Sequence, residues 1–135
     1  MRYMLDTNIC IHLMQGHPAH VAKRFAELEE GDVVMSAITY GELCAGIERR
    51  VSEREGLRRS LEQLTNNIPV LPFDAAAAES YGRLFVASPE RRRNSLDRLI
   101  ASHALAHFLV LVTNNESDFQ NCPGLKIENW VTSPH

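Results

Sequence analysis

Short apolar runs alternate with longer segments of helical periodicity along the 135 residues of the chain. Strands that alternate with helices, with no Asn-Gly hairpin signal between them, favour a parallel sheet. The pattern predicts one α/β domain over residues 1–135, a three-layer α/β/α sandwich around a mostly parallel sheet of four to five strands. The runs expected to form strands are Tyr3–Leu5, Asp32–Ser36, Ile68–Leu71, Leu109–Asn115 and Leu125–Asn129.

Start and stop residues place the helices between these strands. Thr39 and Glu42 have the T-x-x-E spacing of a capping box. Asp74 and Ser95 are expected to cap the two helices that follow them. The helices are expected after Thr7, over His20–Glu30, from Thr39 through Arg50, over Glu53–Thr65, over Ala75–Ser88 and from Leu96 through Phe108.

The composition excludes several classes of protein. Hydrophobic residues make up 44% and charged residues 23% of the chain, as in globular proteins. No apolar run approaches the roughly 18 residues of a membrane span. Asp6 interrupts the stretch that a signal peptide requires, so we expect a cytoplasmic protein without a membrane segment. The three cysteines are scattered and lack the C-x-x-C pair of a zinc or redox site.

The arginines form two groups, although the net charge of the chain is −3. A guanidinium binds phosphate and carboxylate equally well, so each group can face either partner. The first group comprises Arg49, Arg50, Arg54, Arg58 and Arg59, and its members can form surface ion pairs with Glu48, Glu53, Glu55 and Glu62. The second group comprises Arg91, Arg92, Arg93 and Arg98, and it has fewer acidic neighbours.

Three acidic residues fall near the carboxyl edge of the predicted sheet, where open parallel sheets bind ligands. Asp6 ends the first strand, Glu42 lies in the first turn of the helix after the second strand, and Asp97 lies in the first turn of the helix that leads into the fourth strand. Each acid alone has an ordinary explanation as a helix cap or a partner of the helix dipole. Together, three carboxylates repel one another unless a cation lies between them. Mg²⁺, or Mn²⁺, prefers such oxygen ligands and supports phosphodiester hydrolysis.

Four motifs together resemble PIN-domain ribonucleases, and more narrowly the VapC-type toxins of bacterial type II toxin-antitoxin systems. The motifs are MLDTNICI, TYGELCAGIE, LDRLIASHALA and LVTNNESDFQNCPGLKIENW, and the resemblance covers nearly the whole chain. It implies a homodimeric, Mg²⁺- or Mn²⁺-dependent endoribonuclease that is neutralised by a cognate antitoxin and contacts operator DNA only through it. Some toxins of this branch cut the anticodon loop of initiator tRNA and inhibit translation, so the resemblance implies structured RNA, and specifically tRNA, as the substrate.

Position by position, the resemblance assigns catalytic acids, metal ligands and supporting residues. Asp6, Glu42 and Asp97 are the catalytic acids that hold the metal. Asp118 corresponds to a fourth catalytic acid, and Asn115 stands where many PIN domains have an aspartate. The supporting residues are Thr7, Asn8, Thr113, Asn115 and Glu116, of which Thr7 and Thr113 are expected to orient carboxylates. The RNA-binding candidates are Arg91, Arg92, Arg93 and Arg98, which offer a positive rim for phosphates.

Three other interpretations are compatible with the same residues. A PIN fold can act mainly as a binding module in an antitoxin-operator DNA complex, although all three principal acids are present. Asp6 can be the nucleophile of a phosphotransferase, although such proteins commonly have a second aspartate at the position of Asn8. His103 and His107, one helical turn apart, can act as an acid-base pair or as metal ligands. His103, however, continues the apolar stripe of its helix and is expected in the core.

Overall fold

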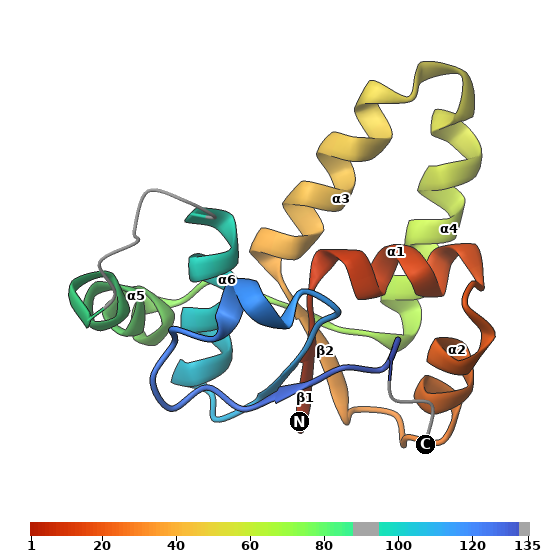
Figure 1. Ribbon diagram of the computed structural model, residues 1–135. Helices are drawn as coiled ribbons and strands as arrows, with labels where there is room; N and C mark the ends of the chain where they lie inside the picture. The colour runs from red at the N-terminus through yellow and green to blue at the C-terminus, as the bar shows by residue number, and fades with distance from the viewer. Residues whose placement is uncertain (88–94, 133–135) are drawn as a thin grey trace.

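The computed structural model describes residues 1–87 and 95–132 and contains a five-stranded parallel sheet between helices (Figure 1). The strand order is β3-β2-β1-β4-β5. The strands are β1 (Tyr3–Leu5), β2 (Val33–Ser36), β3 (Val70–Leu71), β4 (Val110–Val112) and β5 (Ile127–Glu128). The helices are α1 (Thr7–Gln15), α2 (Ala19–Ala26), α3 (Ala37–Arg49), α4 (Arg54–Asn67), α5 (Ala75–Ala87) and α6 (Ser95–Ala106), with 3-10 turns at Val51–Glu53 and Glu116–Phe119.

The predicted α/β/α fold and its parallel sheet are therefore confirmed. All four strand pairs are parallel, and β1 lies in the centre between β2 and β4. In the register of β1 and β4, Leu5 lies opposite Val112. This pairing brings the carboxyl ends of the two central strands to the same height.

The side chains of the strands alternate between two hydrophobic cores, one on each face of the sheet. Tyr3 and Leu5 belong to a core that includes residues of α1, α2, α3 and α4. Met4 points to the other face, where the core includes residues of α5 and α6. The period of two along a strand thus separates the two helical layers. The pair formed by α3 and α4 extends beyond the sheet (Figure 1).

The start of α3 differs from the sequence-based prediction. Ser36, the last residue of β2, caps the helix, and its Oγ accepts a hydrogen bond from the backbone N–H of Ile38 at 3.0 Å. The predicted capping box of Thr39 and Glu42 is wrong, because the helix begins at Ala37 and Thr39 is buried inside it. Glu42 consequently lies in the second helical turn and not in the first.

Other helix boundaries follow local hydrogen bonds. Asp74 caps α5 as predicted, since its Oδ1 accepts from the N–H of Ala77 at 2.9 Å. Helix α2 ends at Ala26, earlier than predicted, and the chain then turns where the carboxylate of Asp32 accepts from the N–H of Glu29. Ser95 is the first residue of α6 and not its cap. Within the described ranges, no helix has the length and apolar character needed to cross a membrane.

The corrected cap of α3 generates a stability prediction. Ser36→Ala removes the cap and the 2.8 Å hydrogen bond between Ser36 Oγ and His103 Nδ1, so we expect the free energy of unfolding to fall by about 2 kcal/mol. The matched variant is Thr39→Val, because Thr39 Oγ1 is buried without a hydrogen-bond partner and its loss is expected to be neutral or stabilising. Urea unfolding measures the free energy of unfolding of both variants. A larger loss of stability in Thr39→Val than in Ser36→Ala would contradict the assignment of Ser36 as the cap of α3.

Candidate functional site

Asp6 directly follows the last residue of β1, and the residue is only 4% exposed. Asp6 caps α1, and its Oδ1 accepts a hydrogen bond from the N–H of Ile9 at 3.0 Å. The hydroxyl of Thr113, directly after β4, donates to the same carboxylate. Burial nevertheless raises the pKa of Asp6 above its ordinary value, and the nearby charge of Glu42 raises it further against these two hydrogen bonds.

A hydrogen bond to the first turn of α1 holds Glu42 near Asp6. The hydroxyl of Thr7 donates to Glu42 Oε1 at 2.6 Å, which connects α1 to α3. Because Thr7 directly follows Asp6, this hydrogen bond holds the side chain of Glu42 beside the carboxyl edge of the sheet. The hydrogen bonds predicted from Thr7 and Thr113 to carboxylates are therefore present.

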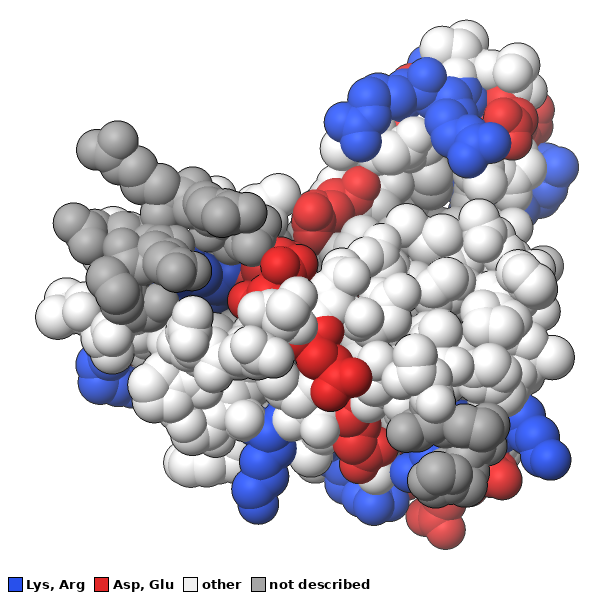
Figure 2. Space-filling model, in the orientation of Figure 1, with Lys and Arg blue, Asp and Glu red and all other residues white. Residues whose placement is uncertain are grey.

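Asp97 and Asp118 complete a group of four interacting carboxylates, named here the acidic group. Asp97 lies in the first turn of α6, and Asp118 lies in the 3-10 turn after β4. Burial raises the pKa of Asp97 to about 6, and the charges of Asp118, Glu42 and Asp6 contribute in that order. Figure 2 shows acidic side chains in a row near the bases of α3 and α6. Four segments far apart in the sequence thus bring negative charge to one place.

The members of the acidic group are not tightly clustered. In residues 1–87 and 95–132, no three of them bring one ligand atom each to within 4.8 Å of one another. Mg²⁺ usually keeps several waters and takes only one or two protein carboxylates directly. The hard oxygen donors, and the neighbouring negative charges that raise the pKa values of Asp6 and Asp97 beyond the effect of burial, fit a hydrated divalent cation of that kind.

Comparisons with known proteins agree with this geometry. The family model described as PIN domain matches residues 3–125. A "tRNA(fMet)-specific endonuclease VapC" from Shigella flexneri is 38% identical over 132 residues, covering 96% of this chain and 98% of that protein. This chain belongs to the PIN-domain family of VapC ribonucleases. Membership of this nuclease family does not favour the phosphotransferase interpretation.

Further relatives support the same family. A "Ribonuclease VapC1" from Haemophilus influenzae strain R2866 is 36% identical and covers 97% of this chain and 99% of its own length. The crystal structure of DNA-bound VapBC from Salmonella typhimurium contains a chain with a TM-score of 0.84 and 34% identity, covering 96% of this chain and 98% of that chain. The VapC resemblance inferred from the four motifs is therefore confirmed.

The other predicted supporting residues of this VapC-family protein are Asn115, Glu116 and Asn8, and each has a different environment. Asn115 donates its backbone N–H to Thr113 Oγ1 at 3.0 Å, so it holds the hydroxyl that bonds Asp6. Glu116 accepts a hydrogen bond from Asn129 Nδ2 at 2.9 Å and is thereby tied to the C-terminal segment. Asn8 is exposed in the first turn of α1.

The arginine predictions have mixed outcomes. Surface ion pairs are confirmed for four of the five arginines of the first group, with Arg50 on Glu53, Arg54 and Arg58 on Glu48, and Arg59 on Glu55. They lie at the tip of the α3–α4 pair, where Figure 2 shows basic side chains, and exposed pairs of this kind contribute little stability. Arg98 is only 8% exposed, so its burial does not fit a phosphate-binding rim. Arg91, Arg92 and Arg93 lie outside the described residues.

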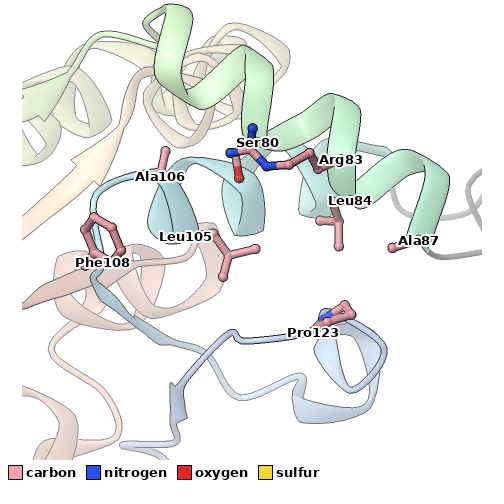
Figure 3. Close-up of a pocket in the computed structure, with 8 residues that line it drawn as sticks. All are labelled: Ser80, Arg83, Leu84, Ala87, Leu105, Ala106, Phe108 and Pro123. Atoms are coloured by element: carbon pink, nitrogen blue, oxygen red, sulfur yellow. The ribbon is translucent and has the colours of Figure 1, made fainter.

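Two hollows lie near the two ends of the sheet. A groove of about 250 Å³ between α1, α3 and α4 adjoins the acidic group, and its lining includes Thr7, Glu42, Gly46 and Leu57. A cavity of about 330 Å³ lies where α5 and α6 meet the segment after β4, and none of the four acids lines it (Figure 3). Its lining includes Phe108, which precedes β4, so it lies toward the opposite end of the sheet.

Sequence reasoning missed one cluster of polar side chains. Asp74 Oδ2 lies 3.1 Å from His107 Nε2, and both residues lie near His103. The prediction of His103 as a core residue is confirmed, since its side chain is fully buried. The i, i+4 spacing of the two histidines was the available signal, but the sequence did not show that Asp74 packs beside them.

The raised pKa of Asp97 generates a pH-dependent prediction. Below about pH 4, Asp97 is neutral in both the folded and the unfolded chain, so its burial carries no charge penalty. As the pH rises through about 6, Asp97 becomes ionised in the folded protein and that part of the stability is lost. Without divalent cations, Asp97→Asn should therefore increase the free energy of unfolding at pH 8 by about 1 to 3 kcal/mol and have no such effect at pH 4.

Chemical denaturation at the two pH values measures this difference. Glu79→Gln, which removes an exposed acid from α5, serves as the matched control and should change stability little at either pH. An equal gain at pH 4 and pH 8 for Asp97→Asn would show that the charge of Asp97 is not the cause.

Proposed function

We propose that this protein is a divalent-cation-dependent endoribonuclease that acts as the toxin of a toxin-antitoxin pair. The observation that carries the proposal is the mutual electrostatic interaction of Asp97 with Asp118, Glu42 and Asp6 in a member of the VapC ribonuclease family. Uncompensated carboxylates in such proximity oppose folding. The presence of all four carboxylates in one place is best explained by a function that uses their combined charge.

In this proposal, Asp6, Glu42 and Asp97 hold Mg²⁺ or Mn²⁺, and Asp118 acts from the outer side of the same site. The cation, when bound, supplies Lewis acidity for a water nucleophile and offsets charge on the phosphate. Thr7 keeps Glu42 in position and Thr113 keeps Asp6 in position through their hydroxyl groups. Attack of water on phosphorus breaks the bond to the 3′ oxygen and leaves a 5′-phosphate and a 3′-hydroxyl.

The substrate we propose is structured RNA, and specifically the anticodon loop of initiator tRNA. The support is the Shigella flexneri relative, whose name gives tRNA(fMet) as its target. Single-stranded loops present unstacked bases, which is where proteins usually recognise RNA sequence. Cleavage of this tRNA would inhibit translation in the cytoplasm.

The partner we propose is a cognate antitoxin that occupies the groove between α1, α3 and α4. The groove is lined by apolar side chains, by Glu42 and by Arg49 and Arg50, so a segment lying in it can present a basic side chain to the acidic group and an acidic one to the two arginines. The Salmonella typhimurium neighbour is a DNA-bound VapBC structure, which supports contact with operator DNA through the antitoxin. We also propose a homodimer of the 15.2 kDa chain.

A cleavage assay tests the enzymatic proposal. The purified chain is incubated with total tRNA and Mg²⁺, and we expect cleavage that yields 5′-phosphate ends and is abolished by EDTA. Asp6→Asn should reduce the rate by at least about 100-fold, since it removes a charge from the site. The matched control is Asp32→Asn, because Asp32 lies before β2 at the other edge of the sheet.

Equal cleavage by the chain, by Asp6→Asn and in EDTA would contradict the metal-dependent mechanism. Products with 2′,3′-cyclic phosphates would contradict it as well. Absence of any cleavage, together with tight binding of the antitoxin-operator complex, would favour the binding-module interpretation.

The antitoxin proposal is tested by filling the groove. A Cβ added at Gly46 would meet no atom within 4 Å, and Gly46 lines the groove, so Gly46→Leu should fold and project into the groove. We expect it to weaken inhibition by the cognate antitoxin by at least tenfold while tRNA cleavage persists. Gly82→Leu, an exposed position of α5 with equal space, is the control. Full inhibition of Gly46→Leu would contradict the proposed docking site.

A further inference from the structure

A second cluster of potential metal ligands lies between α5 and α6, away from the acidic group. Asp74, His103 and His107 each offer one ligand atom, and these atoms all lie within 4.8 Å of one another. In the described part of the chain, they form the one such trio of histidine, cysteine or acidic side chains. His103 lies on α6, His107 follows directly after the last residue of that helix and donates its N–H to the carbonyl of His103, and Asp74 is the cap of α5.

His103 has a buried nitrogen atom that the fold does not satisfy. Its side chain is fully buried, and its Nδ1 lies 2.8 Å from Ser36 Oγ. Its Nε2 is buried without a hydrogen-bond partner. Because buried polar atoms are almost always paired, an unpaired ring nitrogen beside two other potential ligands indicates a missing partner.

The surroundings of His103 favour the form of imidazole that binds metals. Ser36 Oγ already accepts a hydrogen bond from Ile38 and can accept a second one from Nδ1–H, which leaves the lone pair on Nε2. A metal-binding histidine commonly has its other nitrogen fixed in this way. Phe73 lies edge-on against the ring at 5.3 Å between centroids and restricts its orientation. Burial and the charge of His107 lower the pKa of His103, so the neutral ring is favoured.

The other two side chains are held in place but remain accessible. Asp74 Oδ1 is fixed by the N–H of Ala77, while Oδ2 faces His107 Nε2 at 3.1 Å. The side chains of Asp74 and His107 are 41% and 26% exposed. An ion can therefore reach the cluster from solvent, and a water can complete its coordination.

We propose that Asp74, His103 and His107 form a binding site for a borderline divalent cation, with Zn²⁺ as the expected ion. Two imidazoles, one carboxylate and a water suit the four-coordinate geometry of Zn²⁺. Mg²⁺ prefers oxygen ligands and is expected to bind poorly here, so the two sites select different ions. This site is independent of the nuclease function proposed above.

The bound ion would connect the elements that position two members of the acidic group. It joins the start of α5 to α6, which carries Asp97. Through His103 and Ser36 it also reaches the cap of α3, which carries Glu42. Zinc at this site is therefore a structural cross-link, and its loss should lower the unfolding temperature without removing any carboxylate of the acidic group.

Cobalt spectroscopy on the chain of 135 residues tests the proposal. Co²⁺ is titrated in excess Mg²⁺, and we expect one equivalent to bind with a visible absorption band that Zn²⁺ displaces. Asp74→Asn, which retains a good cap for α5, and His107→Ala, at the partly exposed end of α6, should each weaken Co²⁺ binding at least tenfold. Circular dichroism verifies that both variants are folded.

Two control variants separate this site from other possibilities. His17→Ala removes an exposed histidine elsewhere, and Asp97→Asn alters the acidic group; both should keep the absorption band. Absence of saturable Co²⁺ binding in the unmodified chain would overturn the proposal. A band that persists in Asp74→Asn and His107→Ala, or is lost only in Asp97→Asn, would overturn it as well. Failure of tRNA cleavage would not affect any of these outcomes.

Discussion

Burial of the Asp6 carboxylate at the junction of β1, β4 and α1 is the constraint on which the site depends. The backbone N–H of Asp6 donates to the carbonyl of Val112 at 3.0 Å, so the register of the two central strands fixes its position. Its carboxylate then receives hydrogen bonds from Ile9 and Thr113. These contacts keep an acidic side chain in a place where burial opposes its charge.

The members of the acidic group come from different helices and turns, and they meet at the edge of the sheet where Asp6 is buried. Asp97 interacts with three other acids, and its pKa rises to about 6 because burial and those charges act in the same direction. A parallel sheet can gather such residues, since the carboxyl ends of its strands and the helices that follow them meet at one edge. The fold thus accepts an electrostatic penalty at its functional edge, and the two hydrophobic cores on either side offset it.

Short sequence patterns predicted the strands and the cap at Asp74, but they placed the cap of α3 at Thr39 where the structure has Ser36. The hydrogen bonds of Thr7 and Thr113 join segments far apart in the sequence and were predictable only from the family resemblance. The burial of Arg98 was not visible, because its position in the first turn of α6 gives no indication of what packs against it. The contact of Asp74 with His107 joins residues 33 positions apart and depends on how α5 packs on α6.

In the proposed function, a hard divalent cation lies among these crowded carboxylates. Calorimetric titration of Mg²⁺ between pH 5 and pH 8, in two buffers of different ionisation enthalpy, tests whether it does. Because Asp97 has a pKa of about 6, we expect Mg²⁺ binding to strengthen across this range and to release a proton near pH 6, and we expect Asp97→Asn to abolish the release. Mg²⁺ binding that is absent, or that is independent of pH and of Asp97, would rule out the proposed cation site.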